Sequence, residues 1–139
     1  MKRKLLLVPL FLLYGCGDLE NTGGVLTSNQ LPQSVYKFIE GEDILSNEKI
    51  VAYYDLTISL DNSESAILTN KNVIYYKWGR VEKIALSSIK SIREVDCFGT
   101  CILITDINEK LMKIDIAPLN GGPLFLELLK NSKQPKGAV

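Results

Sequence analysis

Apolar positions at the start of the chain form a nearly unbroken stretch behind a short basic head. Met1 to Lys4 hold three basic residues, and Leu5 to Leu13 are apolar throughout except for Pro9. This arrangement is typical of a signal peptide. The stretch is too short to span a bilayer, because a spanning helix needs about 20 apolar residues. We therefore predict that residues 1–15 form a leader peptide.

From Gly17 to Gln30 the apolar character is lost. Gly, Asp, Asn, Thr and Ser are frequent there, and the segment shows neither helical nor strand periodicity. This composition predicts a flexible tether over residues 16–30 that separates the leader from a folded domain. The alternative is that the segment packs on the domain.

Helical spacing begins at the end of this segment. Pro32 suits the first turn of a helix, and the apolar residues around it recur at intervals of three and four, at Leu31, Val35, Phe38 and Ile39. The pattern predicts a short amphipathic helix from Pro32 to Glu40, which Gly41 ends.

Strand signals then continue up to Ile116. β-Branched and aromatic residues alternate between turn residues, and the pattern predicts seven strands at residues 50–60, 66–69, 73–78, 81–86, 91–96, 100–106 and 110–116. The last strand alternates most clearly, with Met112, Ile114 and Ile116 on one face and Lys113 and Asp115 on the other. One face of that strand is therefore expected to meet solvent.

A second amphipathic helix completes the pattern. It starts at Gly122-Pro123, ends near residues 130–133, and carries an apolar stripe of Leu124, Phe125, Leu128 and Leu129. Seven strands followed by one helix predict a mainly β (α+β) fold. We expect a strongly bent antiparallel sheet or partly open barrel with the helix covering one end. The domain is predicted to span residues 31–133, followed by a disordered tail at 134–139.

Composition and charge narrow the functional classes. The 139 residues suffice for one domain, and 46% hydrophobic with 23% charged residues is close to the globular average. Removal of the leader with its three basic residues leaves 13 basic and 16 acidic side chains, a net charge of −3. A mildly acidic chain without a basic cluster disfavours nucleic-acid binding.

The end of the leader, Leu13-Tyr14-Gly15-Cys16, resembles the lipobox of bacterial lipoproteins. The resemblance implies that Cys16 receives a diacylglyceryl group, that the chain is cut before it, and that the domain is anchored to a membrane by lipid. Gly17 stands where aspartate signals retention in the inner membrane, so the outer membrane is favoured if the source has one. An ordinary secretory signal or an uncut hydrophobic anchor is the alternative.

Two segments of the strand region resemble the pleckstrin-homology-like superfold, particularly its bacterial members. They are Leu68 to Tyr76 and Ile84 to Ile92, and the likeness covers Gly41 to Leu129. Eukaryotic relatives bind phosphoinositides through basic residues in the loop joining the first two strands. Here that loop is Asp61-Asn62-Ser63-Glu64, which is acidic. The resemblance therefore bears on the fold, and phosphoinositide binding is not expected.

Two further cysteines, Cys97 and Cys101, flank Phe98-Gly99-Thr100. A hairpin loop there would bring the two sulfurs together across a strand pair, and an oxidising compartment would allow a disulfide. Two free buried thiols are the alternative. A metal site is not expected, because two thiols supply half of a usual zinc shell and no acidic residue lies between them.

Candidate catalytic residues are sparse. Histidine is absent from the whole chain, which removes the commonest general base. Glu40, Glu42 and Asp43 form a carboxylate cluster that could bind a cation or act as acid and base, although a solvated helix end is the simpler interpretation. We expect neither an enzyme nor a cofactor.

Aromatic residues mark two neighbouring strands, at Tyr53, Tyr54, Tyr75, Tyr76 and Trp78. The sharper interpretation is a recognition patch for a peptide or glycan that includes Tyr54, Tyr76 and Trp78. The simpler one is core packing on one face, since aromatic residues are favoured in strands without any ligand.

The leading functional hypothesis is a non-catalytic module that binds an envelope protein or peptide through a sheet edge or a strand–helix groove. The alternative is an envelope lipid-handling protein or hydrolase that uses an apolar barrel end or the carboxylate cluster. A purely structural envelope lipoprotein is a third hypothesis.

Overall fold

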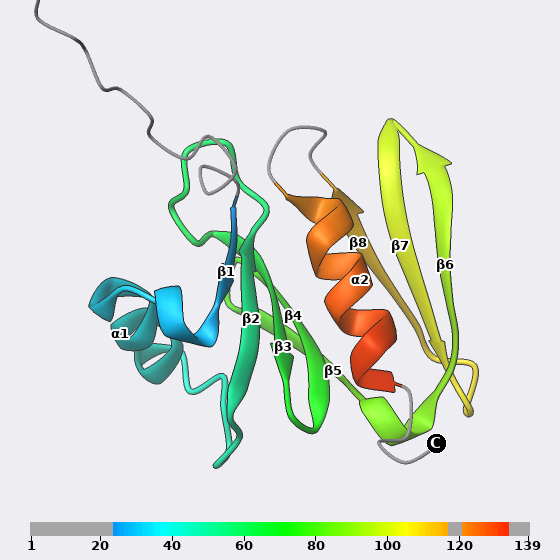
Figure 1. Ribbon diagram of the computed structural model, residues 1–139, viewed down its shortest axis with the longest axis horizontal. Coiled ribbons are helices and arrows are strands. Elements are labelled where there is room, and N and C mark those ends of the chain that lie inside the picture. Colours follow the sequence, from blue (N-terminus) through cyan, green and yellow to red (C-terminus); the bar gives the residue numbers. More distant parts are fainter. Residues whose placement is uncertain (1–23, 117–120, 134–139) are drawn as a thin grey trace, which may run out of the picture.

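Strands and helices follow one another through the described part of the chain, residues 24–116 and 121–133 of a computed structural model (Figure 1). The strands are β1 Val25–Thr27, β2 Ile50–Asp55, β3 Glu64–Thr69, β4 Asn72–Lys77, β5 Arg80–Ala85, β6 Ile89–Cys97, β7 Gly99–Asp106 and β8 Leu111–Ile116. The helices are α1 Gln33–Gly41 and α2 Gly122–Lys133, with short 3₁₀ turns η2 Ser28–Gln30 and η3 Leu86–Ser88. The strands form two antiparallel sheets, β1-β2-β3-β4-β5 and β6-β7-β8.

The five-stranded sheet is covered on both faces at β2 and β3, whereas the edge strand β5 is largely exposed. One face packs against the three-stranded sheet and α2, where Ala52, Tyr54 and Leu68 join the larger core. The other face packs against α1, where Tyr53 and Ile67 join a second cluster. Figure 1 shows α1 and α2 on opposite sides of this sheet. The continuous apolar runs of β2 and β3 follow from burial on both faces.

Helix α2 closes the larger core. Phe125, Leu126 and Leu129 are buried among residues of both sheets. The start of the helix lies against the end of β8, because a Cβ on Gly122 would stand 1.9 Å from the Ile116 Cγ2 atom. Only glycine fits that approach without a shift of the helix or the strand.

The prediction of a mainly β, antiparallel fold with a C-terminal helix is confirmed. The prediction of seven strands in one bent sheet or partly open barrel is wrong, because the described strands number eight and divide into sheets of five and three. Buried and exposed residues alternate along β8 as predicted, since Met112, Ile114 and Ile116 are buried while Lys113 and Asp115 are exposed.

The folded part begins earlier than predicted. Val25 to Thr27 pair with β2, and Val25 is buried in the larger core. The Thr27 and Gln30 side chains then cap each other around η2. The predicted tether is therefore wrong from Val25 to Gln30, because pairing with β2 satisfies backbone groups that a free tether would leave to water. The rest of the tether, the leader and the tail at 134–139 lie outside the described residues.

Most other boundaries agree with the pattern. Helix α1 confirms the predicted helix at Pro32–Glu40, with Val35 and Ile39 on its buried side. Strand β2 ends at Asp55, well before the predicted Leu60, and the chain forms a loop up to Ser63. Within the described ranges, neither helix is long and apolar enough to cross a membrane.

Candidate functional site

Two members of the predicted aromatic patch are buried. Tyr54 has no exposed surface, and its ring lies 5.6 Å from that of Phe125. Tyr76 packs edge-on against Phe38, with ring centres 5.0 Å apart. The prediction that Tyr54 and Tyr76 form an interaction surface is therefore wrong, because α2 covers the face that carries Tyr54 and α1 covers the face that carries Tyr76. Trp78 is exposed, at the turn between β4 and β5.

The predicted carboxylate cluster at the end of α1 does not converge on one point. The Tyr76 hydroxyl donates a hydrogen bond of 3.0 Å to Glu42. Burial, followed by this bond to a carboxylate, raises the pKa of Tyr76. Glu40 and Asp43 instead line an open groove on the other side of the helix end.

This groove, called the acidic groove below, lies between α1, η2 and the start of β2 and has a volume of about 660 Å³. Its lining is Ser28, Tyr36, Ile39, Glu40, Asp43, Leu45, Glu48, Lys49 and Ile50. Ile39 is buried, Leu45 and Ile50 are half-buried, and all three belong to the cluster beneath α1. The groove therefore combines an apolar floor with three carboxylates and one ammonium group.

Glu48 is the most constrained of the three carboxylates. Its Oε2 atom accepts a hydrogen bond of 2.5 Å from the Thr69 hydroxyl. Burial alone would raise the pKa of Glu48, but hydrogen bonds from Thr69 and Asn72 together with the charges of two nearby lysines lower it overall. Asn70 fixes the neighbouring backbone, because its side-chain oxygen accepts from the Lys49 N–H at 2.9 Å. Glu48 is thus held as a charged group.

The structure joins Cys97 and Cys101 in a disulfide, with α-carbons 5.9 Å apart. This separation is within the range that a disulfide tolerates. Cys97 ends β6, Cys101 lies in β7, and the turn between them places Phe98 at its tip. Gly99 supplies the backbone freedom of the turn, with φ at +126°.

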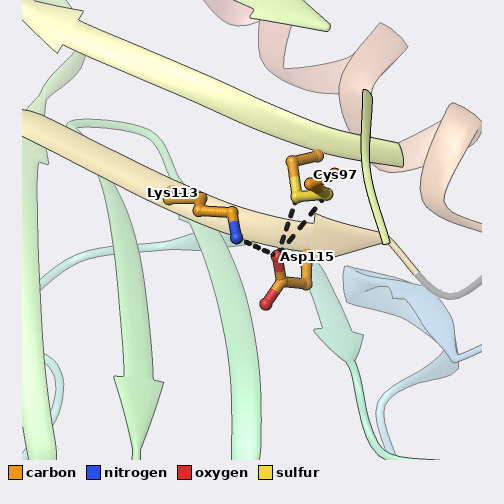
Figure 2. The surroundings of a disulfide bond; sticks show 4 residues. Cys97, Lys113 and Asp115 are labelled. Carbon is orange, nitrogen blue, oxygen red and sulfur yellow. Dashed lines mark hydrogen bonds and ion pairs between the residues drawn. A yellow bond between two sulfur atoms is a disulfide. The ribbon is translucent and has the colours of Figure 1, made fainter. Parts of the chain in front are cut away.

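Asp115 lies directly beside the disulfide (Figure 2). It pairs with Cys101 across β7 and β8, and its Oδ1 atom lies 2.8 Å from the Cys101 sulfur and 3.8 Å from the Cys97 sulfur. The Lys113 ammonium lies 3.0 Å from the same oxygen. A disulfide has no S–H to donate, so these contacts are close approaches in the oxidised protein.

Cys97, Cys101 and Asp115 place three potential ligand atoms within 4.8 Å of one another, and no second group of this kind occurs among the described residues. Metal ligation by cysteine requires thiolates, whereas both sulfurs are joined in the disulfide. The cluster is therefore a redox-dependent feature and gives no metal site in the oxidised state.

The sequence matches no protein-family model and no curated protein. Function is therefore inferred from the sequence and geometry of the chain itself.

The sequence pattern did not predict that Glu48 lines the acidic groove or that Asp115 lies beside the disulfide. Asp115 was assigned to a solvent face, and only the pairing of β7 with β8 shows that it stands opposite Cys101. Glu48 lies in a loop, far in sequence from the carboxylate cluster on α1. The order of charged residues along the sequence predicts neither the position of Glu48 in the groove nor that of Asp115 beside Cys101, because both depend on the tertiary arrangement. Cys16 lies outside the described residues.

Replacing Cys97 and Cys101 together by alanine is expected to lower the free energy of unfolding by about 2 kcal/mol, the loop-closure effect for so short a ring. Denaturation in urea, followed by circular dichroism, measures the change. Reduction of the unmodified protein should produce a similar loss. A loss of more than about 4 kcal/mol would show that the bond supports the whole fold instead of the hairpin.

Proposed function

We propose that the protein is a cell-envelope lipoprotein, anchored through lipid on Cys16, whose β domain is a non-catalytic module for binding an envelope protein or peptide. The anchor is supported by the basic head, the apolar stretch and the lipobox-like end of the leader. The outer membrane is the proposed location in a source that has one. The binding role is supported by the acidic groove.

The acidic groove is the observation that carries the binding role. Its half-buried floor at Leu45 and Ile50 offers apolar contact, and Glu40, Asp43 and Glu48 provide negative charge around it. A complementary ligand carries an apolar side chain flanked by lysine or arginine, because complementary potentials favour encounter and suppress wrong partners. The groove lies beside both a helix and the start of a strand, as in other peptide sites formed by secondary structure.

The alternative, a lipid-handling protein or hydrolase, has less support. The space between the sheets and α2 is occupied by side chains with no exposed surface, including Ile102, Met112 and Phe125. Glu42 is engaged by Tyr76, away from the groove lining. An apolar ligand would therefore have to displace core residues, and the carboxylates do not converge as acid–base chemistry requires.

We also infer a pleckstrin-homology-like origin for the segment from β2 to α2. Seven strands followed by one helix occur there in the expected order, and β1 and α1 precede them. Phosphoinositide binding is not proposed, because the loop between β2 and β3, residues 56–63, contains Asp61 and no basic residue.

The binding role is tested with fluorescent decapeptides that carry one leucine flanked by lysines, measured by anisotropy against the full chain. A Glu40→Lys, Asp43→Lys double variant is expected to weaken binding by about tenfold or more, mainly through slower association. Glu94→Lys, in an exposed position on β6, is the matched control and should bind normally. Equal binding of a peptide with glutamates in place of the lysines would contradict the proposal.

A further inference from the structure

Four large apolar side chains are exposed at one end of the domain, called the apolar end below. Ile58 is 98% exposed, Leu60 55%, Trp78 75% and Phe98 fully exposed. They belong to the β2–β3 loop, the β4–β5 turn and the β6–β7 turn. Such a concentration of exposed apolar groups marks a surface that meets another apolar phase.

Several contacts join the three loops. Ile58 and Phe98 line the same open pocket of about 510 Å³. The Trp78 N–H donates a hydrogen bond of 2.9 Å to the carbonyl of Ser63, at the end of the β2–β3 loop. Figure 1 shows this loop and the β6–β7 turn at the same end of the molecule as the start of β1. Ile58 and Phe98 therefore share one surface, and Trp78 lies at the same end of the domain.

Two of these residues are held in strained backbone conformations. Leu60 has φ of +53° and Trp78 has φ of +45°, a region that large side chains seldom adopt. Trp78-Gly79 forms a two-residue turn in which asparagine is the usual first residue. A tryptophan kept exposed at this position, against local preference, points to a role in binding.

The β2–β3 loop is exposed but is held by hydrogen bonds with Asp55 and Asp61. Asp55 is buried, and its Oδ2 atom accepts a hydrogen bond of 3.0 Å from the Asn62 N–H. Side-chain and backbone hydrogen bonds from Ser63 lower the pKa of Asp61 to about 2. The disulfide restrains the β6–β7 turn in the same way. Apolar groups on rigid loops lose little conformational freedom on binding.

The chain enters the domain at this end. The carbonyl of Gly24 accepts a hydrogen bond of 2.8 Å from the Asp55 N–H, directly before the β2–β3 loop. Eight residue steps separate Gly24 from Cys16, so the two are at most about 28 Å apart even when that segment is fully extended. A lipid on Cys16 therefore keeps the apolar end close to the bilayer surface.

We propose that the apolar end docks onto the bilayer that holds the anchor, with Ile58, Trp78 and Phe98 entering the interfacial layer. The inference rests on the proposed acylation of Cys16. Tryptophan and phenylalanine are favoured at membrane interfaces. Of the nearby charges, Lys77 pairs with Glu64 and Lys113 with Asp115. The exposed charges that remain, on Asp61, Arg80 and Asp96, are of both signs and include no basic cluster. Docking therefore depends on apolar contact and little on salt concentration.

The same orientation leaves the acidic groove free. The groove lies at Ile50, the first residue of β2, whereas the apolar end begins after Asp55, the last residue of that strand. With the apolar end on the bilayer, the groove faces away from the lipid and toward envelope proteins.

Trp78 is the only tryptophan in the chain and reports docking directly. The acylated protein, beginning at Cys16, is reconstituted into phosphatidylethanolamine–phosphatidylglycerol vesicles with and without brominated phosphatidylcholine. Docking is expected to move the Trp78 emission to shorter wavelength, quench it with brominated lipid and protect it from iodide, at low and high salt alike. Emission that stays accessible to iodide and unquenched by brominated lipid would overturn the proposal and would favour a protein partner for this end.

Matched variants separate docking from anchoring. Ile58→Asp and Phe98→Asp are expected to abolish the quenching, whereas Ile107→Asp, an exposed apolar position at the opposite β7–β8 turn, should leave it unchanged. Intact mass establishes the state of Cys16 in each sample. If Cys16 is unmodified, the anchor is refuted, and added vesicles then test docking alone: quenching supports it and lack of quenching overturns it. Equal effects of all three variants would also overturn it.

Discussion

A Phe125→Ala variant is expected to unfold with a free energy about 3–5 kcal/mol below that of the native chain, the usual cost of removing a buried phenylalanine ring. Phe125 has no exposed surface and packs against Tyr54 and residues of both sheets. Small domains are stable by only about 5–15 kcal/mol, so the loss is a large part of the total. Urea denaturation followed by circular dichroism measures it.

Leu124→Ala is the matched control for this prediction. The residue precedes Phe125 on the same helix but is 44% exposed and points away from the core, so the expected loss is within about 1 kcal/mol. A Phe125→Ala loss of that small size would mean that α2 does not join the two sheets. The sheets would then have to hold together without the helix.

The presence of α2 could be predicted from sequence, because its apolar residues have helical period and Gly122-Pro123 marks its start. Its buried face was predicted only in part, since Leu124 of the expected stripe is exposed and Leu126, outside that stripe, is buried. The clean alternation of β8, by contrast, predicted the buried face of Met112 and Ile114. Periodicity identifies an element and its inner face well when one face meets solvent.

Periodicity does not identify the inner face of a strand that is buried on both faces. Tyr53 and Tyr54 both lie in cores, on opposite sides of β2, so alternation gives no inner or outer face. The sequence pattern cannot show that α2 covers the face of Tyr54 and α1 the face of Tyr76, so the pattern alone makes both residues surface candidates. Strand β1 was missed because three residues within a polar segment are too short to show a period.

Candidate sites were less predictable than elements. The disulfide could be anticipated because Cys97 and Cys101 are close in sequence. Asp115 and Glu48 reach their partners through strand pairing and loop packing, which depend on the whole fold. The apolar end was missed for the same reason, because Ile58, Trp78 and Phe98 are far apart in sequence and converge only when three loops are placed side by side.

Replacing Cys16 by alanine is expected to abolish incorporation of labelled palmitate completely. Cys16 is the proposed acyl attachment point, and alanine has no sulfur that could form the thioether. The chain should also keep its leader and begin at Met1 instead of at residue 16, a difference of 15 residues that intact mass resolves. The Cys97→Ala, Cys101→Ala double variant is the control and should retain both the palmitate label and the lower mass of the chain that begins at residue 16.

The strength of membrane anchoring that Cys16→Ala removes follows from the number of acyl chains. Each buried methylene contributes about 0.8 kcal/mol, and one myristoyl chain gives only reversible binding, whereas two or more chains anchor stably. The apolar end adds contact but cannot substitute for the acyl chains, because Ile58, Leu60, Trp78 and Phe98 sit on surface loops. An unmodified Cys16 in the native protein, or label retained by Cys16→Ala, would remove the anchor that brings the apolar end to the bilayer and turns the acidic groove outward.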